Sequence, residues 1–469
     1  MVFSSLAFLL LFLPALCVLF YATPRRWGRA RQYILLAFSL LFYGSGEPRY
    51  IFLIVGCIAL TWFLSRYVKQ RKKTALICGL LVNLVPLAVT KYAGFVTENL
   101  SAVLGTRIPF PAITMPIGIS FYTFQVITFL VDLYRGKVEE PKNPLLFALY
   151  IMFFPQLIAG PIVKYEEVVN ELENPDVSWK NIQYGAGRLI VGLGKKVLLA
   201  NQAGYIASTI QTCPADQLTP WMTWLCVIAY TVQIYFDFSG YSEMAIGLGS
   251  MFGFHFPENF NDPYSSRSIS DFWRRWHITL GRFFREYVYI PLGGNRVKKV
   301  RWIINIMAVW ALTGLWHGAA WNYVIWGVYY GVLIILERVT GITKKLPAFF
   351  SWLFTFLLVM IGWGIFLCDG YPVGKLWEFM SGLFFLRAGG TKPATIASLE
   401  LWGYLPFLAL GFLLASPAGT LLRKGAARLE EKLPAVMKTL HDAGLILVLA
   451  LSLLFLVGGT YNPFIYFRF

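Results

Sequence analysis

The fold is decided by PENFNDPYSSRSISDFWRRWHITLGRFFREYVYIPLGGNRVKKVR, residues 257–301, which leads into an apolar run carrying TGLWHGAAWN, residues 313–322. Residues 262–301 hold nine arginines and lysines against three acidic residues. Two of the four histidines, His277 and His317, lie in the same part of the chain. Polar groups inside a bilayer must be satisfied by protein or by a water-filled cavity. A polar stretch of this size in an apolar chain therefore indicates a functional site.

The rest of the chain has the composition of a membrane protein. Of its 469 residues, 57% are hydrophobic and 14% are charged, whereas soluble domains carry about 25% charged residues. A crossing needs about 20 apolar residues, so we expect an all-α polytopic protein with about 11 transmembrane helices, plus shorter re-entrant and interfacial helices, in one domain over residues 1–469. The candidate spans are 2–21, 33–46, 49–67, 74–90, 115–134, 145–160, 185–206, 221–236, 240–254, 301–316, 321–337, 349–368, 400–416 and 443–459.

The net charge is +17, from 41 basic and 24 acidic residues. The basic residues cluster beside apolar runs, which is typical of cytoplasmic loops and does not favour nucleic acid as a partner. We therefore expect segment 258–301 to lie at the cytoplasmic surface. A basic surface there could contact anionic lipids or an acidic carrier protein.

Residues 270–288 predict one amphipathic helix. Ser268 or Ser270 can cap its N-terminus, and Asp271 suits the positive end of the helix dipole. At about 100° per residue His277 falls on the apolar side, so the helical pattern directs it into protein. A packed histidine with one satisfied hydrogen bond fits that pattern as well. The apolar face holds Phe272, Trp273, Trp276, Leu280, Phe284 and Tyr287, and the opposite face holds Arg274, Arg275, Arg282 and Arg285.

His317 ends an apolar run that starts near Arg301, so a helix of about 1.5 Å rise per residue places it roughly 24 Å deep. An ionisable residue at such depth is a candidate functional group, and a neutral buried imidazole is a competent general base. We expect Gly314 and Gly318 to leave room for a substrate. The alternative is a structural histidine that bonds a neighbouring helix. The spacing of His277 and His317 does not predict a metal site.

Two further spans carry polar stripes. Gln125 belongs to such a stripe in 115–134, and Asp237 belongs to one in 221–243. Polar residues on one helix face predict a shared interior cavity, although hydrogen bonding between helices explains them equally well.

Several motifs are distinctive, namely MPIGISFYTFQ (115–125), FPQLIAGPI (154–162), YFDFSGYSEMAIGLG (235–249), NFNDPYSSRSISDFWRRWHITL (259–280), YIPLGGNR (289–296), TGLWHGAAWNYVIWG (313–327) and NPFIYFRF (462–469). Together they resemble the membrane-bound O-acyltransferase family, and more narrowly its bacterial branch with the membrane subunits of alginate O-acetylation and teichoic-acid D-alanylation. The resemblance implies a ring of tilted helices around a central tunnel and transfer of an acyl group from a thioester to a hydroxyl. It places His317 at the position of the family's catalytic histidine and His277 at its second signature position.

From the residues and this resemblance we expect an acetyltransferase for an extracytoplasmic polysaccharide in the bacterial cytoplasmic membrane. The donor is acetyl-CoA or an acyl carrier protein thioester on the cytoplasmic side, and no cofactor is bound permanently. A secreted or anchored esterase-like acetyltransferase is the expected partner outside. The alternatives are D-alanyl transfer from a carrier protein to teichoic acid and, in another class, a transporter or flippase. The expected substrate-binding residues are Trp273, Trp276, Arg274, Arg275, Trp316, Asn322, Asp237 and Gln125.

Overall fold

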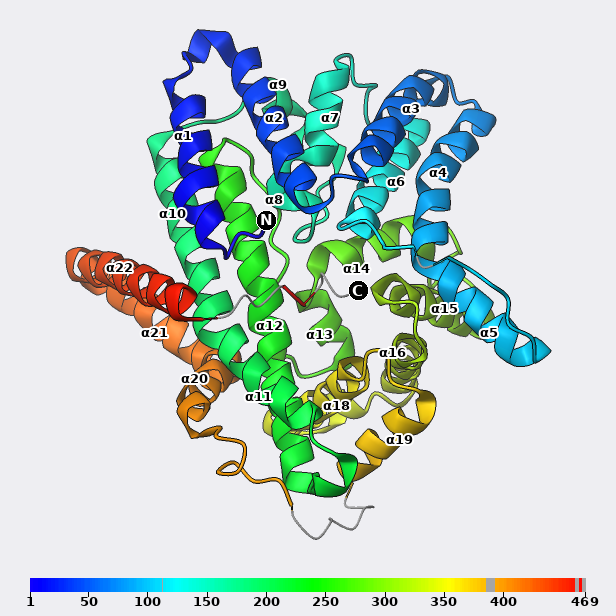
Figure 1. The fold of residues 1–469 in the computed structure, drawn as a ribbon, viewed down its shortest axis with the longest axis vertical. Coiled ribbons are helices and arrows are strands. Elements are labelled where there is room, and N and C mark those ends of the chain that lie inside the picture. The colour runs from blue at the N-terminus through cyan, green and yellow to red at the C-terminus, as the bar shows by residue number, and fades with distance from the viewer. Residues whose placement is uncertain (112, 385–392, 460–463, 466–469) are drawn as a thin grey trace. The chain divides into compact units, whose positions relative to one another are not determined.

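The computed structural model describes residues 1–111, 113–384, 393–459 and 464–465 and is built from helices (Figure 1). Within these ranges the β-type pairing is an isolated bridge between Phe260 and Trp276. The prediction of an all-α protein is confirmed.

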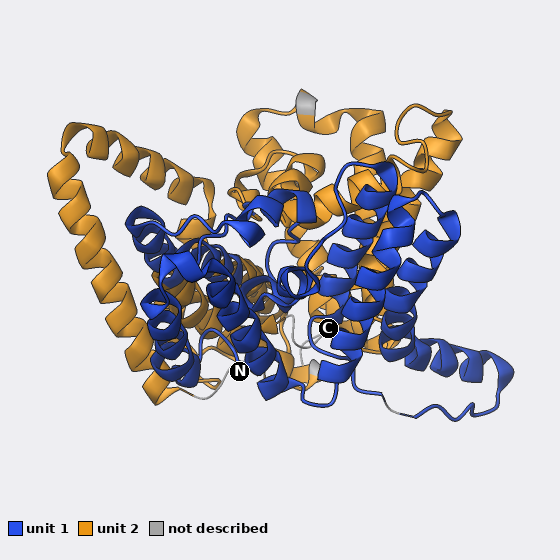
Figure 2. Cartoon of the chain, turned by 90° about the horizontal axis from the view of Figure 1, so that it is seen from above, with its two compact units in different colours: residues 1–189, 241–258 blue, residues 190–240, 259–469 orange. Residues whose placement is uncertain are grey.

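The chain packs as two compact units (Figure 2), which are described separately below. The first unit holds residues 1–189 and 241–258, and the second holds residues 190–240 and 259–469. The single domain expected from the sequence stays a prediction.

The first unit is a set of helices around an aromatic and aliphatic core. In α6 (Ile119–Arg135) buried residues occur on every side of the helix, so burial is not confined to the face that holds Gln125. The candidate span 145–160 forms two short helices, because the chain leaves the first helix at Phe153 and a four-residue helix follows. The other helices of this unit are α1 (Leu13–Ala22), α2 (Gly28–Gly46), α3 (Ile51–Lys69), α4 (Lys73–Leu87), α5 (Ala93–Leu104), α7 (Pro144–Met152), α8 (Phe154–Leu157), α9 (Tyr165–Glu173) and most of α10 (Trp179–Gly194).

The second unit carries the basic stretch and both site histidines. Its first long helix, α12 (Pro220–Met251), continues to Gly240 here and ends in the first unit, so the predicted break between 236 and 240 is wrong. Gly240 lies within this helix and allows a close approach, since a Cβ there would meet the Gly192 carbonyl. The other helices are α11 (Asn201–Gln211), α13 (Ile269–Arg275), α14 (Ile278–Phe284), α15 (Lys299–His317), α16 (Trp321–Thr340), α17 (Ile342–Lys345), α18 (Ala348–Leu367), α19 (Val373–Gly382), α20 (Leu405–Ala415), α21 (Pro417–Lys432) and α22 (Pro434–Gly458).

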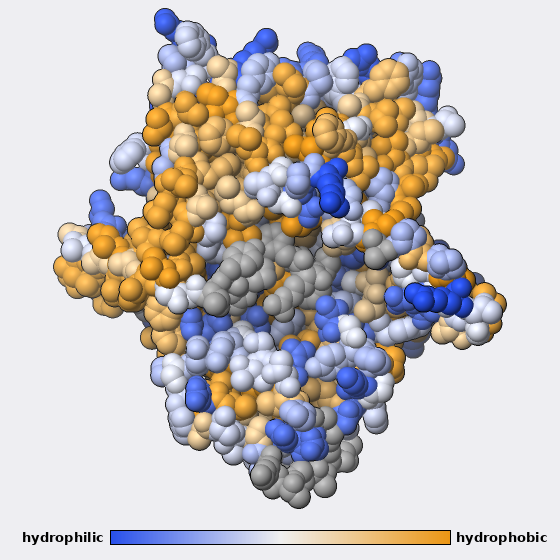
Figure 3. Space-filling view, viewed as in Figure 1, coloured by the Kyte–Doolittle hydropathy of each residue, from blue (hydrophilic) through white to orange (hydrophobic). Residues whose placement is uncertain are grey.

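Several helices are long and apolar enough to cross a membrane. In the described residues five pass by length and composition, namely α3, the run Lys73–Leu104, α16, α18 and α22, and counting two bent pairs as spans gives seven. Hydrophobic side chains cover the visible face of α22, as expected for a helix in lipid (Figure 3). The number of about 11 crossings stays a prediction. The five or seven spans above leave out shorter helices such as α6, which has 17 residues.

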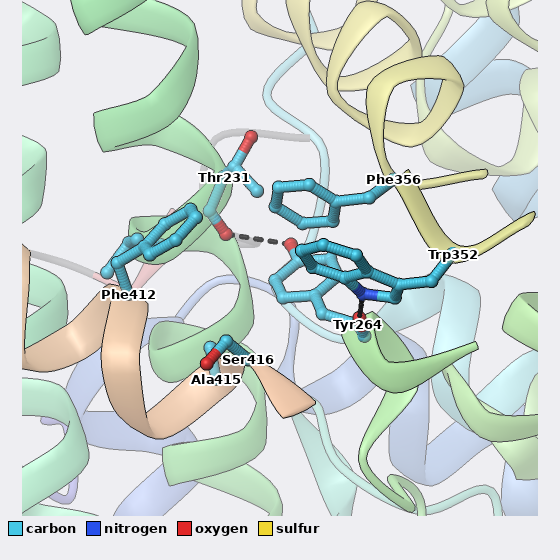
Figure 4. A pocket seen from close by; sticks show the side chains of 8 residues that line it. Thr231, Tyr264, Trp352, Phe356, Phe412, Ala415 and Ser416 are labelled. Carbon is cyan, nitrogen blue, oxygen red and sulfur yellow. Dashed lines mark hydrogen bonds between the residues drawn. The ribbon is translucent and has the colours of Figure 1, made fainter. Parts of the chain in front are cut away.

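Tyr264 anchors the polar stretch inside the second unit. Its hydroxyl donates to the Thr231 carbonyl at 2.7 Å, and its own carbonyl accepts from Trp352 Nε1 at 2.9 Å (Figure 4). The cavity beside it, also lined by Phe356 and Phe412, holds only about 10 Å³, which is room for about one water molecule. The segment that leads into α13 is therefore fixed by packing, by one buried hydrogen bond and by one partly buried hydrogen bond.

Candidate active site

The predicted amphipathic helix 270–288 is broken at His277, so that prediction is wrong. Helix α13 ends at Arg275, and α14 begins at Ile278. Between them His277 adopts the left-handed region, with φ 48° and ψ 54°, which non-glycine residues rarely occupy. The Ser268 hydroxyl accepts from the Asp271 N–H at the start of α13, which confirms the predicted cap.

The two short helices form part of the wall of a pocket of about 1190 Å³ inside the second unit. This volume is above the range of typical small-molecule pockets, which measure roughly 300–1,000 Å³. Five arginines and three acids line it together with an inner wall of aromatic rings, an imidazole and a hydroxyl, so a basic entrance leads to an aromatic interior. The arginines are Arg267, Arg274, Arg282, Arg285 and Arg338, the acids are Asp271, Glu286 and Glu337, and the inner wall includes Trp273, Trp276, His277, Trp310 and Thr313.

His277 is 1% exposed, which confirms that it points into protein. Its ring contacts Phe238 edge-on at a centroid distance of 4.7 Å and Trp316 at 5.7 Å. Its Nδ1 lies 3.2 Å from Asn259 Oδ1. Burial lowers the pKa of the His277 imidazole from 6.5 to about 3, so the ring is neutral at pH 7.

His317 is the last residue of α15 and is 4% exposed. Its ring lies among three aromatic rings, at centroid distances of 4.8 Å to Trp316, 5.0 Å to Trp326 and 5.1 Å to Phe366. The pocket reaches Thr313, one helical turn before it. His317 itself is not among the lining residues, and its link to the pocket is through Thr313 on the same helix.

The glycines beside His317 do not leave the space that the sequence suggested. A Cβ on Gly314 would meet the Tyr323 carbonyl, and a Cβ on Gly318 would meet the Tyr323 ring. Gly327 on α16 likewise lies against the Trp310 carbonyl. These glycines allow α15 and α16 to pack closely, so the expectation that they make room for a substrate is wrong.

The predicted tryptophans fall together in the second unit. Trp276 is 1% exposed and packs against Trp363 at a centroid distance of 4.7 Å. Trp273 packs edge-on against Trp310 at 4.8 Å, and its buried Nε1 has no hydrogen-bond partner among the described residues. The Trp316 ring contacts both imidazoles.

The three other predicted polar residues, Asn322, Asp237 and Gln125, are buried in different surroundings. Asn322 is buried in the second unit, and its amide donates weakly to the Phe366 carbonyl at 3.4 Å. Asp237 forms a 2.5 Å ion pair with Lys196 and accepts from the Ile465 N–H at 2.7 Å. Gln125 lies in the first unit, buried, and neither amide atom has a hydrogen-bond partner within the described part of the chain.

The arginines differ in their surroundings. Arg274 lines the pocket and contacts Asp271 Oδ1 at 3.1 Å, whereas Arg275 pairs with Asp271 Oδ2 at 3.0 Å and is not part of the pocket lining. Sequence reasoning missed Glu337, because it lies 68 residues after Ile269 and no local pattern links the two. Glu337 Oε2 accepts from the Ile269 N–H at 2.6 Å and so caps α13 from α16.

The chain belongs to the membrane-bound O-acyltransferase family, whose sequence model matches residues 60–373. It is therefore an acyltransferase and a multi-pass membrane protein. A protein of Pseudomonas aeruginosa named "Probable alginate O-acetylase AlgI" is 34% identical over 529 aligned positions that cover all of both chains. A peptidoglycan O-acetyltransferase of Helicobacter pylori is 36% identical and covers 73% of this chain and 71% of its own. A teichoic acid D-alanyltransferase of Bacillus subtilis is 30% identical and covers 68% of this chain and 84% of its own.

Proposed function

We propose that this enzyme transfers an acetyl group from a cytoplasmic thioester to a hydroxyl group destined for an extracytoplasmic glycan, in the cytoplasmic membrane of a bacterium. The observation that carries the proposal is the pocket of the second unit. Its entrance is basic, its inner wall reaches His277, and Trp316 links His277 to His317. The acetyl group and the glycan follow from the names of the Pseudomonas and Helicobacter relatives.

The pocket suits a thioester of coenzyme A. The exposed side chains of Arg274, Arg285 and Arg338 are placed to bind phosphate groups, which guanidinium groups recognise in a bidentate manner. The thioester arm then lies along Trp273 and Trp276, where the Trp273 Nε1–H donates to the arm and so gains the partner that this buried group lacks among the described residues. The pocket holds the donor as a substrate, and the enzyme uses no permanently bound cofactor.

The chemistry is a single acyl transfer at His317. The imidazole removes the proton of the acceptor hydroxyl as its oxygen attacks the thioester carbonyl. The new C–O bond forms, the C–S bond breaks, and the proton held by His317 passes to the leaving thiolate. Burial among aromatic rings keeps water from competing with the hydroxyl.

His317→Ala tests the proposal, with His441→Ala as a matched control because His441 is exposed on α22. Surface polysaccharide from cells that make each form would be analysed by mass spectrometry, and enzyme in lipid vesicles would be assayed with radiolabelled acetyl-CoA. We expect acetyl transfer at background for His317→Ala and at the wild-type level for His441→Ala, with equal amounts of protein in the membrane. Activity near wild type in His317→Ala would refute the role of His317.

The Bacillus relative favours D-alanyl transfer from a carrier protein as the second candidate function. The two functions differ in their donor, so vesicles with wild-type enzyme would receive either acetyl-CoA or a D-alanyl carrier protein thioester. We expect label transfer from acetyl-CoA alone. In the cell, an esterase-like acetyltransferase outside the membrane would complete the transfer to the glycan. Transfer from the carrier protein alone would favour the second function.

A further inference from the structure

The backbone around His277 is held by a second segment of the chain. The Asn261 N–H donates to the Arg275 carbonyl at 2.9 Å, and the Ile278 N–H donates to the Asn259 carbonyl at 3.0 Å. These two hydrogen bonds bracket His277 on both sides. They keep the residue in its left-handed conformation, which an isolated chain would rarely adopt.

The side chain of Asn259 completes this arrangement. It is fully buried, and its Oδ1 lies 3.3 Å from the Thr279 N–H nitrogen, 2.9 Å from Thr279 Oγ1 and 3.2 Å from His277 Nδ1. A backbone N–H can only donate, so the amide atom that faces Thr279 must be the oxygen. The orientation of the Asn259 amide is thereby determined by its contacts.

We propose that Asn259 is a positioning residue that fixes the tautomer of His277. Because Asn259 Oδ1 can only accept, the Nδ1 atom next to it must carry the imidazole proton. The opposite tautomer would set the lone pair of Nδ1 against the lone pairs of the oxygen at 3.2 Å in a buried site. Neutral His277 therefore keeps its proton on Nδ1 and its lone pair on Nε2.

This assignment determines what His277 can bind, and it rests on the function proposed above. With its proton on Nδ1, the neutral ring offers the substrate an acceptor at Nε2 and no donor there. His277 thus binds an N–H or O–H group, such as an amide N–H in the arm of the thioester. It cannot stabilise the negative oxygen that develops on the thioester carbonyl, since that task needs a hydrogen-bond donor.

Solid-state NMR of the enzyme in lipid bilayers, with ¹³C,¹⁵N-labelled histidine, would test the tautomer directly. The signals of His277 are assigned by their loss in His277→Gln. We expect a neutral ring protonated at Nδ1 at pH 7 in the wild type. In Asn259→Ala, which removes the acceptor, we expect a mixture with the Nε2-protonated form. Thr279→Val is the matched control, because it removes one donor to Asn259 and leaves the imidazole contact, so it should keep the wild-type tautomer.

Kinetics provide a second readout. If the tautomer positions the donor, Asn259→Ala raises the KM for acetyl-CoA by about tenfold, because the imidazole no longer holds its acceptor at Nε2 toward the donor and one hydrogen bond is lost. Thr279→Val leaves the KM within about twofold. An Nε2-protonated ring in the wild type would overturn the inference even if His277→Ala impairs transfer. Unchanged KM and kcat in His277→Ala would instead overturn the proposed role of His277 in binding the donor.

Discussion

The buried pair of Asp237 and Lys196 provides a sharp test of a residue that the sequence assigned to the substrate. Asp237 Oδ1 lies 2.5 Å from Lys196 Nζ, and the two side chains are 1% and 4% exposed. Asp237 Oδ2 also accepts from the Ile465 N–H at 2.7 Å. Both carboxylate oxygens therefore contact protein, and we expect Asp237→Asn to act on stability and not on binding of the donor.

The magnitude follows from burial. Removing one partner of a buried ion pair costs about 3–5 kcal/mol, because the other charge stays in a poorly solvated place. Asp237→Asn keeps the size of the side chain and an acceptor for the Ile465 N–H, so the loss should come from the ion pair. Lys196→Met should cost a similar amount. The double variant should lose much less stability than the sum of the two single losses, because the effects of substitutions within one ion pair are not additive.

The assay is thermal inactivation in detergent, with the KM for the proposed donor, acetyl-CoA, measured on protein that stays folded at low temperature. We expect both single variants to lose activity several degrees below the wild type, the double variant to lie between, and the KM to be unchanged in all three. A wild-type inactivation temperature for Asp237→Asn together with a raised KM would refute this reasoning. Asp237 would then contact the substrate, as the polar stripe in the sequence suggested.

Three further outcomes follow from the second unit. Glu337→Ala should lower the stability of α13 by about 0.5–2 kcal/mol, as for a lost helix cap, and raise the KM for the donor. Glu337→Gln keeps an acceptor for the Ile269 N–H and should therefore change both quantities less than Glu337→Ala. Equal changes in the two variants would contradict the role of Glu337 as a cap. Gly327→Val should destabilise the α15–α16 contact by about 1–3 kcal/mol, because a Cβ there meets the Trp310 carbonyl, whereas Gly444→Val meets nothing within 4 Å and serves as the control in thermal inactivation. Because the pKa of His277 is lowered, the unfolded chain binds a proton below pH 6.5, whereas the folded chain binds it only near pH 3. The free energy of unfolding should therefore fall as the pH falls from 6.5 to 3, by up to about 1.4 kcal/mol per pH unit. His277→Gln should reduce this dependence on pH.

The sequence predicted the helical class and many element positions, because apolar runs and end signals are local. Ser268 was expected to cap a helix and does so. Tertiary contacts changed the rest. The chain between the predicted spans 221–236 and 240–254 stays helical, and Gly240 there lies close to the Gly192 carbonyl, 48 residues earlier in the chain. Gly314 and Gly318 look like space for a ligand, but Tyr323 fills that space.

The candidate site shows the same division. Burial of His277 and His317 could be predicted from their apolar surroundings, and both are buried. The contacts that hold them could not be predicted, since they join residues far apart in the chain. Asn259 stands 18 residues before His277 with no helical spacing between them, and Glu337 reaches Ile269 from another helix. Only the folded chain brings these groups together.

The break at His277 places α13 and α14, which both line the pocket, on either side of the imidazole. A left-handed non-glycine residue costs on the order of 1–3 kcal/mol and persists only where surrounding contacts determine it. Here the Asn259 and Asn261 hydrogen bonds supply those contacts, and caps from Ser268 and Glu337 hold the helix before it. If residues 276–278 were helical, the Ile278 N–H would donate to a carbonyl of the same helix and not to the Asn259 carbonyl. Asn259 would then no longer be held beside the imidazole. The strained residue therefore positions the imidazole, and the aromatic periodicity around it only buries the ring.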